Sequence, residues 1–266
     1  MIKFTLVTVT YNAAATFAPT AESVLRQSYA DVEHIIIDGA STDDTLAMAE
    51  AYMQRSQQTA PRHEVIIVSE PDGGLYDAMQ KGLNRATGDY VCFLNAGDRL
   101  PDDDTLLSIA DKTDIENKPG VLYGDTLVVD AQGTVVGRRH LAPPEHLSWR
   151  SFRQGMLVCH QAFYALTEVA RQEPYDQQYR YSADVDWCIR VMKRCEQEQR
   201  QLVNLHAVVC HYLREGQTTL HHRASLRERF RIMVHHYGWP VTIVMHGWFA
   251  LRSILRKLRQ RDSSSL

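Results

Sequence analysis

The first hundred residues alternate between short apolar runs and longer stretches with helical spacing. The runs are rich in β-branched and other apolar residues, which predicts β-strands at Lys3–Val9, His34–Ile37, Glu64–Ser69 and Tyr90–Leu94. Helices are predicted at Thr20–Gln27, Thr42–Arg55 and Leu75–Arg85, and Ser41 with Asp44 forms a capping-box pattern before the second of them. Strands that alternate with helices predict an α/β fold whose mostly parallel sheet is covered on both faces.

Polar residues follow each predicted strand, at Thr10–Asn12, Asp38–Ser41, Glu70–Gly74 and Asn95–Asp98. In parallel sheets ligands bind beyond the carboxyl ends of the strands. We therefore expect these four loops to meet at one edge of the sheet and to form a ligand site there.

The second half of the chain has a different pattern. Val121–Val129 and Thr134–Gly137 flank Ala131-Gln132-Gly133, which predicts a β-hairpin, and Ser182–Cys195 has helical spacing. With 266 residues, of which 44% are hydrophobic and 23% charged, the chain has the composition of an ordinary globular protein. We expect one catalytic domain at residues 1–220 and a helical tail at residues 221–266.

The tail has a charge opposite to that of the body. Residues 221–266 carry 9 basic and 2 acidic side chains, a charge of +7, so 20 basic and 30 acidic side chains remain in the body, a charge of −10. Apolar residues recur at three- and four-residue steps from Val241 to Leu258, with Arg252, Arg256 and Arg259 on the other side. This pattern predicts an amphipathic helix on an anionic membrane surface, or one packed on the body or at a dimer contact. No nucleic acid is expected.

Five scattered cysteines without metal-binding spacing predict buried, reduced thiols. The first residues enter a strand without the pattern of a secretory signal. We expect a cytoplasmic protein, peripheral on the inner face of the membrane if the tail binds lipid. The tail pairs His221-His222 and His235-His236 are expected to be solvated or membrane-facing, since adjacent helical residues point apart and chelate poorly.

Several segments together resemble the family 2 glycosyltransferases of the GT-A type, especially those that build bacterial surface polysaccharides. They are TLVTVTYN, HIIIDGASTDDT, EPDGGLYDAMQKG, LNAGD and SADVDW, and the resemblance covers roughly residues 3–220. It implies a GT-A fold and transfer of a sugar, with inversion, from a UDP- or GDP-type sugar donor. It also implies a glycan or lipid-linked acceptor and a divalent metal, Mg²⁺ or Mn²⁺.

The resemblance places the nucleotide and donor sugar at the loops after the strands. Asp38 matches the carboxylate that faces the nucleotide base, and Thr8, Tyr11 and Asn12 lie on the adjacent loop. The alternative for Asp38 is a simple Asp-Gly turn.

Three further residues are assigned to the donor side. Asp72 matches a position near the nucleotide and donor sugar, and Asn95 lies on the same rim. Lys81 matches the family's YDAMNKG pattern and could reach a phosphate, although an ion-paired surface lysine is nearly as common.

The metal is assigned to Asp98, which follows the fourth strand, with His211 as a second residue that could meet the metal or the diphosphate. Here the chain departs from its relatives. Most of the family has Asp-x-Asp or Asp-x-Asp-Asp, whereas this chain has Asn95 and Gly97 where two carboxylates would stand. Fewer acidic ligands predict weaker metal binding, and the alternative is that Asp98 caps a turn.

The resemblance assigns the general base to Asp184, at the start of a predicted helix. Asp186 is the rival for this role, or an acceptor-side residue, unless it pairs with Arg190 four positions later. His160 and Gln161 match an HQA segment and are assigned to the acceptor side, where they would hold sugar hydroxyls or orient the base.

Two other classes of protein remain open at this point. A nucleotidyltransferase would be expected to carry a Gly-rich, basic loop after the first strand, and Thr8–Ala15 has neither feature. A non-catalytic protein that binds a nucleotide sugar is favoured by the thinned Asn95–Asp98 loop.

Overall fold

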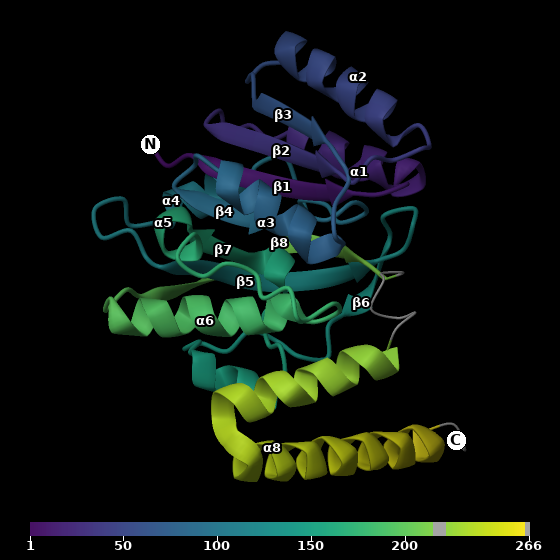
Figure 1. Cartoon of the computed structure of the whole chain (residues 1–266), viewed down its shortest axis with the longest axis vertical. Coiled ribbons are helices and arrows are strands. Elements are labelled where there is room, and N and C mark those ends of the chain that lie inside the picture. The colour runs from purple at the N-terminus through teal and green to yellow at the C-terminus, as the bar shows by residue number, and fades with distance from the viewer. Residues whose placement is uncertain (215–221, 264–266) are drawn as a thin grey trace.

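The computed structural model describes residues 1–214 and 222–263 and contains one mixed sheet with helices on both faces (Figure 1). Hydrogen-bonded neighbours follow the order β3-β2-β1-β4-β7-β5-β6, and β8 pairs with β5. The predicted α/β class is correct.

The parallel half of the sheet consists of β1 (Phe4–Thr10), β2 (Val32–Asp38), β3 (Glu64–Ser69) and β4 (Tyr90–Phe93). Within the register, Thr10 lies opposite Asp38, and Asp38 lies opposite Ser69. The strands therefore end together, and the polar loops after them share one rim.

Helices cover both faces of this half. α1 (Ala14–Leu25) and α2 (Thr45–Gln58) pack with β2 around Phe17, Ile36 and Tyr52, and α3 (Leu75–Arg85) packs against β1 and β2. The first helix begins six residues earlier than predicted and contains Pro19.

The predicted capping box is wrong. Asp44 is the N-cap of α2 but makes no capping hydrogen bond. The Ser41 hydroxyl is engaged elsewhere: it accepts from the backbone N–H of Asn12 and donates to Asp38.

The other half of the sheet is largely antiparallel. β5 (Val121–Val129) pairs with β6 (Val135–Arg138), as the predicted hairpin requires, and with β7 (Phe163–Leu166). β8 (Leu202–Leu213) runs parallel to β5. The helical elements of this half are α4 (Thr105–Asp111), η1 (Trp149–Gln154), η2 (His160–Ala162), α5 (Thr167–Ala170) and α6 (Ala183–Gln197).

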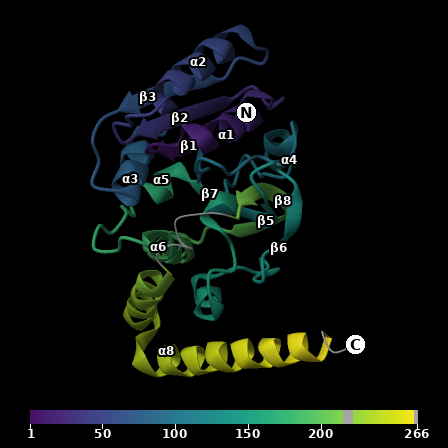
Figure 2. The same cartoon turned by 90° about the vertical axis from the view of Figure 1, so that its right-hand side faces the viewer.

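The C-terminal helix α8 (His222–Ser263) has a kink at Gly238, whose φ of 80° is not helical. The first segment packs against α6 and η1, so the predicted tail starts as part of the body. After the kink the chain changes direction, and the second segment lies farther from the sheet than the first (Figures 1 and 2). No helix within the described ranges is long and apolar enough to span a bilayer. All five cysteines are buried free thiols, as predicted.

Candidate active site

Asp184 lies at the start of α6 and is held by two hydrogen bonds. The Tyr76 hydroxyl donates to its Oδ1 at 2.9 Å, and the Nδ1 of His160 donates to its Oδ2 at 3.1 Å. Burial would raise the pKa of this carboxyl group, but the hydrogen bond from His160, the charge of Arg229 and the Tyr76 hydroxyl together hold the pKa below its usual value. Asp184, 9% exposed, is therefore a fixed and ionised carboxylate at neutral pH.

His160 connects this carboxylate to the loop after β4. The side-chain amide nitrogen of Asn95 lies 3.0 Å from its Nε2. Because a carboxylate can only accept, the proton of a neutral His160 must be on Nδ1, and Nε2 then accepts from the Asn95 amide. An ionised aspartate at position 95 could only accept, so it would face the lone pair on Nε2 of His160 without forming a hydrogen bond. Asn95 therefore fixes the tautomer that holds Asp184.

Asp98 is enclosed by the protein. Its Oδ2 accepts from the side chain of Gln161 at 2.8 Å and its Oδ1 from the backbone N–H of Leu213 at 2.9 Å, and the residue is 4% exposed. Burial raises the pKa of Asp98 to about 6, against the effect of these two hydrogen bonds. Gln161, itself buried, is therefore occupied inside the protein rather than presented to an acceptor.

Gly97 has no room for a side chain. Its φ is +103°, which favours glycine, and a Cβ there would lie 2.5 Å from Cδ2 of Leu213. An acidic residue at this position would therefore strain the backbone and displace the Leu213 side chain.

The loop after β4 and the start of α6 lie on the same side of the molecule. His160 bonds both Asn95 and Asp184, and the adjacent Gln161 bonds Asp98. Burial raises the pKa of Tyr212 to about 12, and the negative charges of Asp98 and Asp184, one from each segment, add to this rise. The adjacent residues His160 and Gln161 thus link these two segments.

The residues of this loop do not fit a divalent metal held by the chain. Such a site needs carboxylate oxygens that an ion can reach, and Asp98 is only 4% exposed, with a protein donor on each oxygen. Burial and the charge of Arg99 lower the pKa of His211, whose acidic neighbour is Asp102 rather than Asp98. Within residues 1–214 and 222–263, no three His, Cys, Asp or Glu side chains gather as a metal site. The remaining oxygen is the buried Oδ1 of Asn95, which has no protein partner there.

Asp38 is a structural residue in this geometry, contrary to its assignment to the nucleotide base. Its Oδ1 accepts from the hydroxyls of Thr10 and Ser41, and its Oδ2 accepts from the backbone N–H of Ser41 and the hydroxyl of Ser69. Burial would raise the pKa of Asp38, and these donors lower it. With four bonds and 1% exposure, the carboxylate ties three strand ends together.

Thr8 is also internal, which corrects its assignment to the nucleotide. Its hydroxyl donates to the carbonyl of Leu94 at 2.7 Å and lies 2.9 Å from Nε2 of His34, while Nδ1 of His34 lies 2.8 Å from the Tyr52 hydroxyl. Thr8 and His34 are fully buried. Neither residue can reach a ligand.

Tyr11, Asn12 and Asp72 lie on the open part of the rim. Tyr11 is 67% exposed, and a Cβ at Gly39 would meet both the Tyr11 ring and the Asp72 carboxylate, so these side chains converge over Gly39. Exposed Asn12 connects the first two loops, because its Oδ1 accepts from the backbone N–H of Thr42 at 2.9 Å. An exposed aromatic ring beside a carboxylate is suited to a nucleoside base and its N–H groups.

Lys81 is engaged at the edge of this rim. Its Nζ donates to the carbonyl of Pro71 at 2.8 Å and forms ion pairs with Glu70 at 3.1 Å and Asp77 at 3.6 Å. The side chain thus joins the Glu70–Gly74 loop to α3. Lys81 is therefore an ion-paired lysine, which was the alternative to a phosphate-binding role.

Asp186 faces away from Asp184 and is fully paired. Arg190 donates to its Oδ2 at 2.7 Å, and the Nε2 of His236 lies 2.7 Å from its Oδ1. The expected pairing with Arg190 is correct, and the carboxylate has no free edge for an acceptor. His236, which was predicted to be solvated or membrane-facing, is instead buried in this contact. His221, from the other predicted pair, lies outside the described residues.

Two residues of this site were not assigned a role from the sequence. Tyr76 opens the YDAMQKG segment, and that motif was the only signal for it. Arg229 lies in the predicted tail, and its approach to Asp184 depends on the packing of α8, which no sequence pattern shows.

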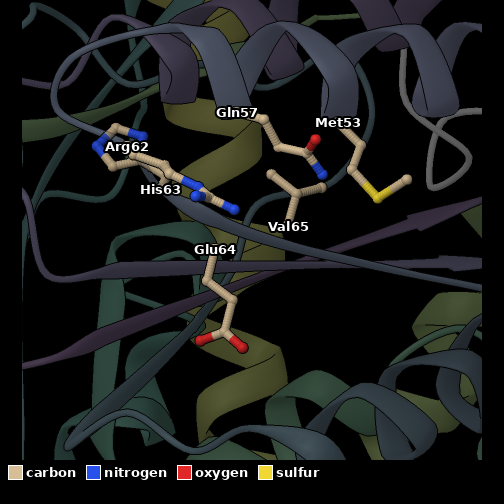
Figure 3. A pocket seen from close by; sticks show the side chains of 6 residues that line it. All are labelled: Met53, Gln57, Arg62, His63, Glu64 and Val65. Atoms are coloured by element: carbon tan, nitrogen blue, oxygen red, sulfur yellow. The ribbon is translucent and has the colours of Figure 1, made fainter.

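A shallow hollow of about 230 Å³ lies at the opposite edge of the sheet. Residues of α2 and β3 line it, and Figure 3 shows Met53, Gln57 and Val65 on one side of β3 with Glu64 pointing away. β3 is the edge strand farthest from β5 and β6 in the sheet order, so this hollow is separate from the Asp184 site.

Known structures share this fold. The structure of S. aureus TarS, residues 1–349, in complex with UDP-GlcNAc gives a TM-score of 0.65 at 16% identity over 88% of this chain and 67% of that chain. In the TarS complex with UDP this chain spans 66% of the solved chain. The mannosyltransferase PcManGT of Pyrobaculum calidifontis, solved with GDP-Man and Mn²⁺, gives a TM-score of 0.61 at 18% identity. The match covers 92% of this chain and 68% of that chain. The GT-A fold is therefore confirmed.

Sequence relatives give the family. A PGL/p-HBAD biosynthesis glycosyltransferase of Mycobacterium tuberculosis is 31% identical over 210 residues, 79% of this chain and 76% of its own. The amylovoran biosynthesis glycosyltransferase AmsB of Erwinia amylovora is 28% identical over 72% of this chain and 64% of its own. The sequence profile of the family described as Glycosyl transferase family 2 matches residues 5–170. The chain belongs to glycosyl transferase family 2 and is a glycosyltransferase.

Proposed function

We propose that this glycosyltransferase moves one sugar from a nucleoside diphosphate sugar to a hydroxyl group of a glycan or lipid-linked saccharide, with inversion at the sugar's C1. The observation that carries the proposal is Asp184, an ionised carboxylate held by His160 and Tyr76 beside the rim of the sheet. A base of this kind is what an inverting transfer needs opposite the leaving group.

The reaction is a single displacement. The acceptor oxygen attacks C1 while Asp184 takes the hydroxyl proton, and the bond between C1 and the diphosphate oxygen breaks. Its electron pair leaves with the nucleoside diphosphate. Because His160 and Tyr76 donate to the two oxygens of Asp184, they keep the carboxylate in one orientation during proton transfer.

The donor nucleotide would lie over Gly39, between Tyr11 and Asp72. Both side chains are accessible there, and Asp38 and Thr8 support the rim from inside. The solved relatives are described with UDP, UDP-GlcNAc or GDP-Man, which supports a UDP or GDP donor for this chain. No group of three His, Cys, Asp or Glu side chains gathers as a metal site in the described residues, and no step is assigned to the expected Mg²⁺ or Mn²⁺.

The biological setting proposed is the synthesis of a bacterial surface polysaccharide or glycolipid. The names of the mycobacterial and Erwinia relatives, which refer to PGL/p-HBAD and amylovoran biosynthesis, support it. The catalytic unit would comprise residues 1–220 together with the first segment of α8, because that segment packs on α6 and η1.

The second segment of α8 would bind an anionic membrane surface on the cytoplasmic side. Trp239, Ile243, Val244, Trp248 and Leu251 are between 48% and 70% exposed. The same region of sequence carries Arg252, Arg256, Lys257, Arg259 and Arg261. Exposed apolar side chains with a basic flank complement a bilayer that contains anionic lipids.

The test of the activity is release of nucleoside diphosphate from a panel of UDP- and GDP-sugars, with sugar-lipid and oligosaccharide acceptors. Asp184→Asn should lower the turnover number by at least about a hundredfold, because general base catalysis contributes on that order. Exposed Asp111 provides the matched control, since Asp111→Asn removes a carboxylate far from the site. Normal turnover by Asp184→Asn would remove the proposed mechanism.

A further inference from the structure

The strongest unexplained feature of the site is a cation that comes from the C-terminal helix. A leaving nucleoside diphosphate carries negative charge that the enzyme must neutralise. The loop after β4 does not fit a chain-held metal, because Asp98 is closed by two donors and Gly97 has no space for a side chain. We therefore consider which cationic side chain near the site could supply this charge.

The start of α8 is fixed against the start of α6. The hydroxyls of Ser182 and Ser225 lie 3.0 Å apart, and both residues are buried. The carboxylate of Glu228 accepts from the backbone N–H groups of Arg180 at 2.9 Å and Tyr181 at 2.7 Å. These bonds hold α8 beside the residues that immediately precede Asp184.

Arg229 is carried toward Asp184 by this contact. It lies four residues after Ser225, so it is on the same face of the helix, one turn further on. Its Nε is buried and has no hydrogen-bond partner among the described residues. Its positive charge acts on both Asp184 and Tyr76.

The guanidinium of Arg229 is not neutralised by a close carboxylate in the described part of the chain. No ion pair within 4.0 Å involves it there. The neighbouring Glu228 instead accepts hydrogen bonds from the backbone N–H groups of Arg180 and Tyr181, just before α6. Arg139 is the other cation near the site, acting on Cys159 and Tyr212, but it already donates to the carbonyls of Met156 and Leu157.

We propose that Arg229 binds the diphosphate of the nucleotide donor and stabilises it as it leaves, in place of a divalent cation held by acidic residues. A planar guanidinium can bond two phosphate oxygens at once, which suits a leaving diphosphate. This inference rests on the proposed function, because it names the group that the same site stabilises. It also makes the first segment of α8 part of the active site.

The test measures binding of UDP and, in parallel, GDP to the full chain by calorimetry in EDTA and then with Mn²⁺. The wild type should bind one of these diphosphates in EDTA, and Mn²⁺ should change the affinity by less than about threefold. Arg229→Gln should weaken that diphosphate about tenfold or more, as expected for loss of a charged hydrogen bond, while affinity for the matching nucleoside changes little. The diphosphate affinity of Arg229→Lys should lie between those of the wild type and Arg229→Gln.

Two variants serve as comparisons. Exposed Arg227 lies on the same helix, and Arg227→Gln should bind like the wild type. Circular dichroism spectra and unchanged nucleoside binding show that Arg229→Gln is folded. Diphosphate binding that requires Mn²⁺, or that Arg139→Gln weakens while Arg229→Gln does not, overturns the inference and leaves the glycosyltransferase proposal intact. Failure of the wild type to bind UDP or GDP under either condition overturns both.

Discussion

The Nδ1 of His160 lies 3.1 Å from Oδ2 of Asp184 and donates a hydrogen bond to it. The other ring nitrogen accepts from Asn95, so a residue of the loop after β4 determines the state of a residue at the start of α6. The amide at position 95 thus acts through a histidine in this chain. Asn95 orients the proposed base, Asp184, through His160.

Replacing His160 should change the pH dependence of the reaction. The hydrogen bond from His160 lowers the pKa of Asp184, against the effect of burial, so His160→Phe should raise that pKa. The acidic limb of the kcat/KM profile, where activity is lost as Asp184 becomes protonated, should then move to higher pH. A kcat/KM profile from about pH 4 to 8, a range that brackets ordinary carboxyl and histidine values, measures the shift. His140, which is exposed, gives the control His140→Phe. A lower rate with an unmoved acidic limb would leave His160 with a packing role only.

Gly97→Ala should destabilise the protein. The residue would have to adopt a φ of +103°, and its Cβ would meet Leu213. The cost of the backbone alone is about 1–2 kcal/mol, and the contact adds to it. Urea unfolding measures the free energy of unfolding. Gly137→Ala is the matched control, because nothing lies within 4 Å of a Cβ there. Equal stability of the two variants would contradict the crowding at the turn.

The buried pair of His34 and Tyr52 should make stability depend on pH. Burial, and to a smaller extent the charge of His63, lower the pKa of His34 to about 3. An unfolded chain has an ordinary histidine pKa of about 6.5, so between these values the unfolded state binds the extra proton. The contribution of His34 is therefore present above about pH 6.5 and is lost as the pH falls toward 3, by several kcal/mol.

Unfolding curves of the wild type and His34→Gln between about pH 7 and pH 4 test this dependence. The variant should be less stable at neutral pH and should lose less stability as the pH falls. Exposed His140 again provides a control, because His140→Gln should keep the wild-type slope. Parallel slopes for the wild type and His34→Gln would show that other groups cause the acid sensitivity.

Membrane binding should depend on the second segment of α8. Val244 is 70% exposed on this segment, and Val244→Asp should abolish sedimentation with vesicles that contain phosphatidylglycerol, because it places a negative charge against an anionic surface. Val136, 47% exposed on β6, offers the same substitution on the body, and Val136→Asp should sediment like the wild type. Neutral phosphatidylcholine vesicles should bind less well than anionic ones. The membrane proposal fails if wild-type protein does not bind anionic vesicles at low salt.

The sequence by itself determined the α/β fold, because hydrophobic periodicity distinguishes short buried strands from helices, and because polar residues after each strand mark the rim. β3 and α3 begin and end at the predicted residues. The starts of α1 and α2 were less well predicted. Pro19 lies inside α1 although proline disfavours a helix interior, and Ser41 does not cap α2 although serine is a common helix cap.

The roles of the polar residues were decided by the tertiary structure. A sequence shows that Asp38, Asp98 and Asp184 follow strands or begin a helix, but not whether their oxygens are free. Four protein donors enclose Asp38, whereas Asp98 and Asp184 each accept two hydrogen bonds. Of the three carboxylates Asp184 is the most exposed, at 9% against 4% for Asp98 and 1% for Asp38. The approach of Arg229 depends likewise on the packing of α8 against α6. Hydrogen-bond saturation and long-range packing join residues far apart in the chain, and no local pattern encodes them.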